Sequence, residues 1–211
     1  MNKPSLRGLY AITDGPRDDL LDAVEQALAG GARLLQYRDK TSDAARRLAE
    51  ARALQQLCRT RDAVFIVNDD VALAKAVQAD GVHLGKDDGD LAEARAALGG
   101  EAIIGVSCYD SLDRAKRAAG AGADYVAFGA FFPSPTKPHA PRASIELLRQ
   151  SAALGVPRVA IGGITPDNAP SLVEAGADAL AVISAVFGAA DIRAAAQRFA
   201  RLYPCNRKSD R

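Results

Sequence analysis

The sequence predicts a single-domain α/β protein with the closed (β/α)8 architecture of a TIM barrel. Short apolar runs alternate along the chain with Ala- and Leu-rich segments of helical period. The apolar runs number eight, and none carries a charge at its centre, which is typical of parallel strands covered by helices on their outer face. An open doubly wound sheet is the alternative. The turn after the first run, AITDGPRDD, lacks the GxGxxG pattern that such a sheet usually shows.

Each element follows from its own stretch of sequence. The expected strands are Leu9–Thr13, Arg33–Tyr37, Val64–Asn68, Gly81–Leu84, Ile103–Ser107, Tyr125–Gly129, Arg158–Ile161 and Ala179–Ile183. Helical periodicity is clear in Leu20–Ala29, Ala44–Arg59, Leu91–Leu98 and Ile145–Leu154. The junctions AGGARLLQY, QADGVHL, AGADYVAF and AGADALAV are each expected to end a helix with a left-handed glycine. This modular pattern predicts one domain over residues 1–204 and a polar tail over 205–211.

Composition excludes several classes of partner. The chain has 211 residues and a net charge of +1, so it has no global field for nucleic acid or an anionic membrane. Cys58, Cys108 and Cys205 match neither a disulfide framework nor a zinc knuckle, which favours a reducing compartment. No apolar stretch is long enough for a signal peptide core or a spanning helix. We therefore expect a soluble cytoplasmic protein whose anion binding is local. The sequence leaves open whether the chain forms a homo-oligomer.

The second expected strand ends in residues suited to an anion. In a barrel of this class the site lies at the carboxyl ends of the strands. Gln36, Arg38 and Lys40 alternate in QYRDK and would point the same way from an extended backbone. Two cations at the barrel mouth suit a phosphate or diphosphate. An ordinary solvated strand end is the alternative.

Acidic residues follow the third and fourth expected strands. Asp69 and Asp70 come after Asn68, and Asp87 and Asp88 follow HLGK. Asp70 is suited to cap the helix that begins at VALAKA, but capping does not easily account for both clusters. Acids from adjacent strands beside two cations suit Mg²⁺ held together with substrate phosphate oxygens.

His83 lies inside the fourth expected strand. No second histidine or cysteine lies at metal-ligand spacing from it, so a packed core histidine is expected.

The loop FFPSPTKP follows the sixth expected strand. Ser134, Thr136 and Lys137 are carried by a segment whose prolines restrict its conformations before binding, which suits an anion clamp. A rigid connector with incidental hydroxyls is the alternative.

The seventh expected strand runs into IGGITPDNA. Gly162 and Gly163 can let backbone N–H groups approach a ligand, and Thr165 or Asp167 can start the next helix. Together with VISAVFG after the eighth strand, this suggests a phosphate cradle. A tight strand-to-helix turn would also explain the two glycines.

Seven motifs occur in a fixed order along the chain: QYRDK, ND, HLGxxD, GVS, FPSPTKP, GGI and VIS. Over about residues 8–187 they resemble the thiamine phosphate synthase family. The resemblance implies a (β/α)8 barrel that joins 4-amino-2-methyl-5-hydroxymethylpyrimidine diphosphate to a thiazole phosphate, carboxylated or not. The products would be thiamine monophosphate and pyrophosphate.

The resemblance also implies roles for individual residues. The pyrimidine diphosphate would be bound by Gln36, Arg38, Lys40, Asn68, Ser107 and Lys137. The residues expected to act in catalysis are Arg38, Lys40, Ser107 and Lys137. One Mg²⁺ ion per site would be bound by Asp69 and Asp88. The thiazole phosphate would be bound by Ser134, Thr136, Gly163, Ile183 and Ser184.

The implied mechanism is a dissociative substitution that needs no protein nucleophile. This agrees with the residues themselves, which offer no convincing Ser/His/Asp or Cys/His set. Two positions depart from the family pattern, Lys86 where Gln is usual and Ser134 where Thr is common. The rival readings are a thiazole-phosphate tautomerase-like barrel, a non-catalytic barrel that binds a phosphorylated ligand, and a sugar-phosphate isomerase or lyase.

Overall fold

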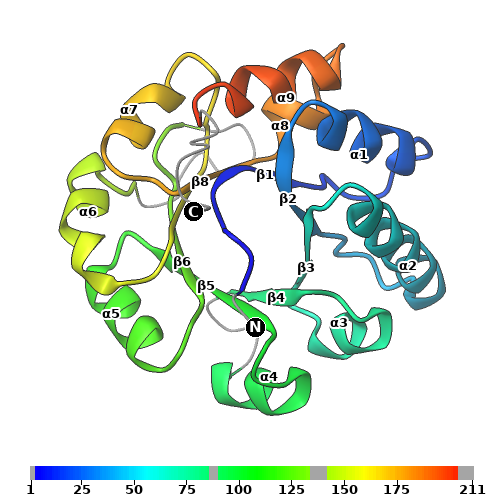
Figure 1. Cartoon of the computed structure of the whole chain (residues 1–211), viewed down its shortest axis with the longest axis horizontal. Coiled ribbons are helices and arrows are strands. Elements are labelled where there is room, and N and C mark those ends of the chain that lie inside the picture. Colours follow the sequence, from blue (N-terminus) through cyan, green and yellow to red (C-terminus); the bar gives the residue numbers. More distant parts are fainter. Residues whose placement is uncertain (1–2, 86–89, 134–141, 204–211) are drawn as a thin grey trace, which may run out of the picture.

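A computed structural model describes residues 3–85, 90–133 and 142–203 of the chain. Eight parallel strands form a closed barrel in chain order, and helices surround it as an outer ring (Figure 1). The strands are β1 (Gly8–Ile12), β2 (Ala32–Tyr37), β3 (Val64–Asn68), β4 (Gly81–Leu84), β5 (Ile103–Tyr109), β6 (Tyr125–Phe128), β7 (Arg158–Ile161) and β8 (Ala179–Val182). The predicted fold class is confirmed, and every predicted strand is present to within two residues at each end.

The helices lie between the strands, as the alternating pattern predicts. They are α1 (Leu20–Ala29), α2 (Ala44–Thr60), α3 (Val71–Val77), α4 (Leu91–Leu98), α5 (Leu112–Gly120), α6 (Ile145–Gln150), α7 (Ala169–Glu174), α8 (Ser184–Phe187) and α9 (Ile192–Ala200). The segment predicted as one helix over Ile145–Leu154 is α6 followed by a 3-10 turn, Ser151–Leu154. Among the described helices, none is long and apolar enough to cross a membrane.

Several helices begin at a residue whose side chain accepts a hydrogen bond from a first-turn N–H group that has no backbone acceptor. The side chains of Asp43, Asp90 and Asp191 accept bonds from the first-turn N–H groups of α2, α4 and α9. Each such cap contributes about 1 kcal/mol to the stability of its helix. These caps fix where each helix begins and hence the length of the loop before it.

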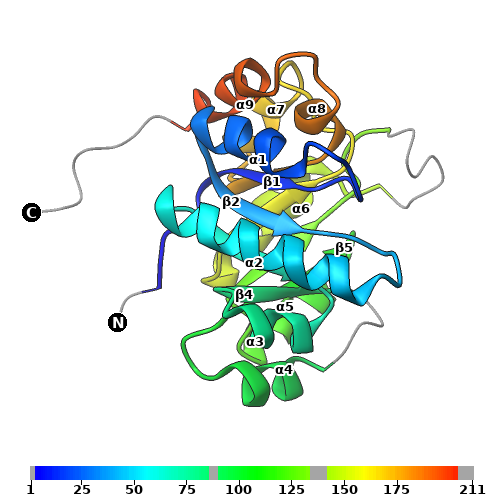
Figure 2. The ribbon, with the colours of Figure 1, turned by 90° about the vertical axis from the view of Figure 1, so that its right-hand side faces the viewer.

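The barrel separates the buried apolar residues into two clusters. Alternate residues of each strand point to opposite faces, so Leu9 and Ala11 pack outward under the helices while Tyr10 points inward. The inner cluster includes Leu34, Ile66 and other strand residues. In the side view of Figure 2, α1 and α2 flank β2 and cover its outer face.

The glycine junctions behave as expected in three of four cases. Gly31, Gly122 and Gly176 have positive φ at the ends of helices. The prediction for QADGVHL is wrong, because Gln78 takes the left-handed conformation that ends α3. Gly81 instead begins β4, where a methyl group would overlap the backbone carbonyl of Ile103. Close packing of two strands therefore requires this glycine.

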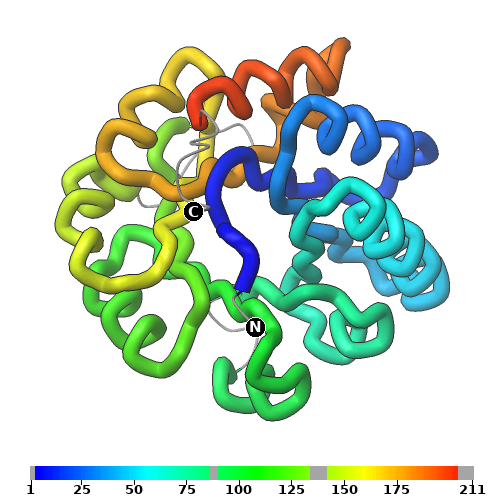
Figure 3. The backbone as a smooth tube through the Cα atoms, in the orientation of Figure 1, coloured from blue at the N-terminus to red at the C-terminus, as the bar shows by residue number. Residues whose placement is uncertain are grey.

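The segment before β1 crosses the barrel at the end opposite the site. The tube in Figure 3 shows it passing over the centre of the ring of strands. Leu6 is buried in the inner cluster, and Lys3 forms an ion pair with Asp124. This segment therefore closes the amino-terminal end of the barrel with an apolar side chain.

Candidate active site

The end of β2 carries one buried amide and two cations. Gln36 lies inside the barrel with 2% of its surface exposed, Arg38 is half-buried, and Lys40 is exposed. β2 ends at Tyr37, so Arg38 and Lys40 lie beyond the strand rather than in the extended backbone that the alternation assumed. Thr13 fixes the backbone there, because its hydroxyl accepts from the N–H of Arg38 at 2.8 Å and donates to its carbonyl at 3.1 Å.

The intervening residues of the same stretch face α2. Tyr37 donates to Glu50 at 2.6 Å, and the buried carboxylate of Asp39 lies 2.6 Å from Arg46. Burial alone would raise the pKa of Asp39, but bonds from Thr41 and Arg46 outweigh it and hold that pKa below its ordinary value. Asp39 thus stays charged and ties the loop to the outer helix.

The end of β3 separates the roles of its two acids. Asp70 caps α3 by accepting from the N–H of Leu73 at 2.8 Å, as predicted, and also pairs with Arg47 at 2.8 Å. Asp69 has a φ of 62°, in the left-handed region that few non-glycine residues adopt. Asn68 donates to the Asp69 carboxylate at 2.5 Å. The second predicted metal ligand, Asp88, lies outside the described residues, as do Lys86 and Asp87.

A chain of hydrogen bonds crosses the interior between two predicted site residues. Gln36 Nε2 donates to Tyr10 Oη at 2.8 Å, and Tyr10 Oη lies 2.9 Å from Tyr125 Oη. Tyr125 Oη lies 2.9 Å from His83 Nδ1, and His83 Nε2 lies 2.9 Å from Ser107 Oγ. The sequence interpretation missed both tyrosines. The alternation of side chains along β1 and β6 would have placed both tyrosines inside the barrel if it had been known which face of each strand points inward.

The prediction that His83 is a packed core residue is confirmed. Its ring stacks on Tyr125 with centroids 5.6 Å apart, and both ring nitrogens have protein partners. Burial lowers the pKa of His83 to about 4, so the imidazole is neutral at neutral pH. Gly105 makes room for this packing, because a methyl group there would overlap the Tyr125 ring.

The predicted phosphate cradle is described only in part. Gly162 and Gly163 have positive φ, and a methyl group on Gly163 would overlap the carbonyls of Phe132 and Pro133. The diglycine is therefore needed for close contact with the segment after β6, a reason that the sequence interpretation did not include. Ile183 follows β8 and Ser184 begins α8. The other predicted cradle residues, Ser134, Thr136 and Lys137, lie outside the described residues.

The helix after the diglycine begins later than predicted. Its first residue is Ala169, with Asn168 before it, rather than a residue next to Thr165 or Asp167. Thr165 and Asn168 bond each other, since the N–H of Thr165 donates to Asn168 Oδ1 at 2.9 Å. Asn168 also donates to the carbonyl of Gly163 at 3.0 Å. The polar groups that could have capped the helix therefore form this turn, which holds the diglycine in place.

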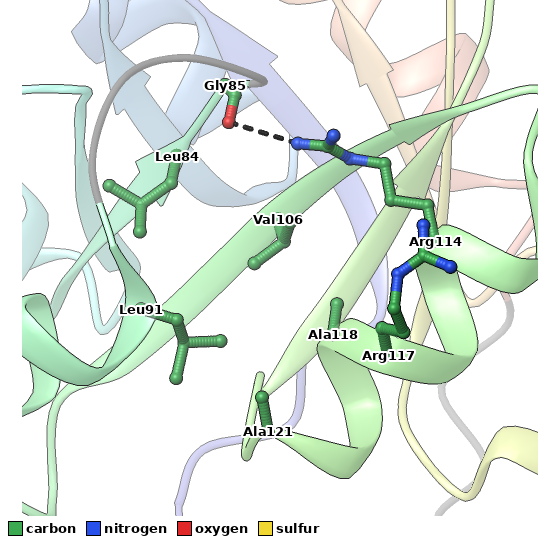
Figure 4. A pocket seen from close by; sticks show the side chains of 8 residues that line it. All are labelled: Leu84, Gly85, Leu91, Val106, Arg114, Arg117, Ala118 and Ala121. Atoms are coloured by element: carbon green, nitrogen blue, oxygen red, sulfur yellow. Dashed lines mark hydrogen bonds between the residues drawn. The ribbon is translucent and has the colours of Figure 1, made fainter.

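A pocket of about 250 Å³ lies outside the barrel, between β4, β5 and α5 (Figure 4). Its apolar lining includes Leu84 and Val106, which belong to the outer cluster. Arg114 donates to the carbonyls of Gly85 and Ser107, at 3.5 and 2.7 Å. The pocket contains none of the predicted site residues. Arg114 instead braces the backbone of Ser107 from the outer side.

The described donors suit a hard cation and an anion. Asp69 and Asn68 offer oxygen atoms of the kind that Mg²⁺ prefers, together with phosphate oxygens of a substrate. Among the described residues, no group of three or more His, Cys, Asp or Glu side chains forms a complete metal site. One carboxylate plus substrate oxygens is the usual composition of a magnesium site, so the residues present fit this ion.

Comparison with known proteins gives consistent results. A family model described as thiamine monophosphate synthase matches residues 9–186. The chain is 58% identical over 199 residues to the thiamine-phosphate synthase of Chromobacterium violaceum, covering 93% of this chain and 96% of that one. It is 62% identical over 189 residues to the thiamine-phosphate synthase of an Azoarcus species, covering 88% and 92%.

A solved structure agrees with these relatives. The thiamine phosphate pyrophosphorylase from Pyrococcus furiosus superposes on the chain with a TM-score of 0.85 and 38% identity, covering 94% of this chain and 96% of that one.

Proposed function

The chain belongs to the thiamine monophosphate synthase family, and we propose that the carboxyl end of its barrel joins hydroxymethylpyrimidine diphosphate to a thiazole phosphate. It is an enzyme, a transferase of thiamine biosynthesis with small-molecule substrates. The observation that carries this is 58% identity over nearly the full length of a thiamine-phosphate synthase. The rival readings of a tautomerase-like barrel, a carrier or a sugar-phosphate enzyme have no comparable support.

We place the pyrimidine diphosphate at the ends of β2, β3 and β5. Gln36 and Asn68 lie at or next to the carboxyl ends of β2 and β3, Ser107 lies in β5, and they would recognise the ring and its diphosphate. Arg38 and Lys40 follow Gln36, where a fixed backbone can direct both cations toward the phosphates. Lys137 would complete this half of the site.

We place magnesium at Asp69, with Asp88 as the second carboxylate. When bound, Mg²⁺ would neutralise negative charge on the pyrophosphate group as it departs. The left-handed φ of Asp69 supports this placement, because such strain is often kept where a side chain must point in a required direction. Asp70 is already used by its cap and by Arg47.

We place the thiazole phosphate on the far side of the mouth, at the ends of β6, β7 and β8. Gly163 would present its backbone, and Ile183 and Ser184 would contact the phosphate or the ring from the end of β8. Ser134 and Thr136 would add hydroxyl donors. The smaller side chain at Ser134 keeps the hydroxyl that a threonine would supply.

The chain's own residues then act by position and charge. Arg38, Lys40 and Lys137 would hold the diphosphate and stabilise charge as its bond to the pyrimidine methylene breaks. Ser107 would donate to the same substrate. The thiazole nitrogen forms the new bond to the methylene carbon, and pyrophosphate leaves. No side chain needs to act as a nucleophile, which is consistent with the neutral, fully bonded His83.

We also propose a cytoplasmic location. Cys58 and Cys108 are buried and unpaired in the described part of the chain, as expected in a reducing compartment.

Pyrophosphate release is the direct test. The purified protein is given the pyrimidine diphosphate and Mg²⁺, with and without thiazole phosphate, and thiamine phosphate is measured in parallel. Release that requires the thiazole and matches thiamine phosphate supports the proposal. Release without coupling, or none with both ligands bound, contradicts it.

An Arg38→Ala variant should lose affinity for the pyrimidine diphosphate far more than for the thiazole phosphate. Arg33→Ala, an exposed arginine on the same strand, serves as its control.

A further inference from the structure

The hydrogen-bond chain through the barrel has a direction that its first bond determines. Gln36 uses its Nε2 group to donate to Tyr10 Oη. A phenol has one hydrogen, and Tyr10 Oη lies 2.9 Å from Tyr125 Oη. Tyr10 accepts from Gln36, and Tyr125 is the other hydrogen-bond partner of its buried hydroxyl among the described residues, so we assign the Tyr10 hydrogen to the bond with Tyr125. The Tyr125 hydrogen then goes to His83 Nδ1, 2.9 Å away.

The same direction continues to the end of β5. A neutral imidazole carries one N–H, so an Nδ1 that accepts requires the hydrogen on Nε2. His83 Nε2 therefore donates to Ser107 Oγ at 2.9 Å. Ser107 receives this bond and has its own hydrogen available outside the chain of bonds. At the other end, the Gln36 side chain keeps its carbonyl oxygen, which can only accept, and the second hydrogen of Nε2.

The packing around the chain keeps its members in place. Tyr10 and Tyr125 are 1% and 0% exposed, and their rings meet edge to face with centroids 6.1 Å apart. The Tyr125 ring lies over Gly105 and stacks on His83. Burial raises the pKa of both tyrosines, so each keeps its hydrogen at neutral pH. Rotating the Gln36 amide by half a turn would reverse every bond in the chain. The donor or acceptor role at one end is therefore coupled to the role at the other end.

We propose that Tyr10, Tyr125 and His83 are positioning residues that orient the Gln36 carbonyl oxygen as a hydrogen-bond acceptor and make Ser107 a hydrogen-bond donor toward the pyrimidine diphosphate. This inference rests on the proposed placement of that substrate at the two residues. Gln36 then accepts from an N–H donor of the ligand, for which the exocyclic amino group is suited, and Ser107 donates to a ring nitrogen or phosphate oxygen. The arrangement favours an aminopyrimidine over its oxo analogue, whose oxygen would face the Gln36 carbonyl.

The tautomer of His83 tests the direction without any substrate. The chain has two histidines, His83 and His139, so a His139→Gln variant assigns the imidazole signals. Proton–nitrogen correlation spectra of the wild-type protein at neutral pH distinguish the two neutral tautomers. We expect His83 to carry its hydrogen on Nε2. A hydrogen on Nδ1 would mean that the chain runs the other way, and it would overturn the proposal.

Kinetics of a Tyr125→Phe variant test the positioning role. Removing this hydroxyl breaks the chain in the middle while keeping the ring. We expect the KM for the pyrimidine diphosphate to rise about tenfold, the KM for the thiazole phosphate to stay the same, and the preference for the amino over the oxo analogue to fall. Tyr203→Phe is the matched control, because its hydroxyl bonds the Ala177 carbonyl outside the barrel. Equal effects in the two variants would refute a positioning role.

These outcomes separate this inference from the proposed function. An inactive wild-type protein would contradict the coupling reaction, whereas the His83 tautomer would still report the direction of the chain. An active protein with the Nδ1–H tautomer would keep the function and remove the inference.

Discussion

Thr13 bonds both backbone groups of Arg38, accepting from its N–H at 2.8 Å and donating to its carbonyl at 3.1 Å. The hydroxyl thereby links the end of β1 to the residue that follows β2. A Thr13→Val variant keeps the side-chain shape and loses both bonds. We expect the KM for the pyrimidine diphosphate to rise several-fold, because the Arg38 backbone is less restrained. Steady-state kinetics would measure this.

Thr60→Val is the control for the loss of a threonine hydroxyl bond, at an exposed residue. Its hydroxyl donates to the Leu57 carbonyl at the carboxyl end of α2. An equal change of KM in both variants would contradict the role given to Thr13.

Asp69 and Asp70 are adjacent but should respond differently to substitution. Asp69→Asn should raise the Mg²⁺ concentration needed for half-maximal activity at least about tenfold, with little change in stability, because it removes one carboxylate ligand. Asp70→Ala should lower the free energy of unfolding by about 1 kcal/mol, because it removes the cap of α3 and the pair with Arg47. Magnesium titrations and urea denaturation measure the two effects. The reverse pattern would show that the two acids had been assigned wrongly.

Gly105 and Gly120 provide a matched pair of alanine substitutions. An added methyl group at Gly105 would overlap the Tyr125 ring, whereas none of the described atoms lies within 4 Å of one at Gly120. We expect Gly105→Ala to destabilise the protein by about 1–3 kcal/mol through overpacking. Gly120→Ala, at the last residue of α5, should be neutral or slightly stabilising. Chemical denaturation tests both, and similar stabilities would mean that the ring moves aside without cost.

Asp124 should make stability depend on pH. Burial alone would raise its pKa, but bonds from Lys3, the Ile104 N–H and Arg95 outweigh this and lower the pKa in the folded state. A depressed folded pKa contributes stability above the unfolded value of about 3.9, and the contribution is lost as pH falls through the folded value. Asp124→Asn should therefore cost about 1–3 kcal/mol at pH 7, and the difference from wild type should shrink below about pH 4.

Asp113 is the control for this pH dependence. Its side chain is 80% exposed and lies 3.7 Å from Lys116, so Asp113→Asn should change stability by less than about 0.5 kcal/mol. A difference between wild type and Asp124→Asn that stayed constant down to pH 2 would contradict the assignment of this carboxylate.

The strands were predictable because each is buried on both faces. A run such as VFIV is apolar throughout, so a strand of the barrel can be recognised from its local sequence alone. The same property hides which residues point inward. Nothing in LYAI shows that Tyr10 faces the interior while its neighbours face the outer helices, because both faces exclude water. The polar chain through the barrel therefore required the three-dimensional structure.

The role of individual glycines was predictable only where a glycine ends a helix and its role depends on the local sequence. Gly31 and Gly176 follow helices, and the local sequence is enough to suggest a left-handed residue there. Gly81 is needed because a neighbouring strand approaches it, and that strand lies more than twenty residues away in the sequence. Contacts of this kind between distant segments leave no local pattern.

The pairing of β1 with β8 has a consequence for how the protein is made. Gly8 pairs with Ala179 and Ala11 with Val182, so β1 is synthesised long before β8, the strand that covers this edge of it. Contacts across so long a loop form slowly during folding. Until then, β1 presents unpaired backbone groups on that edge. A nascent chain of this protein is therefore exposed to mispairing at this edge until β8 has been synthesised.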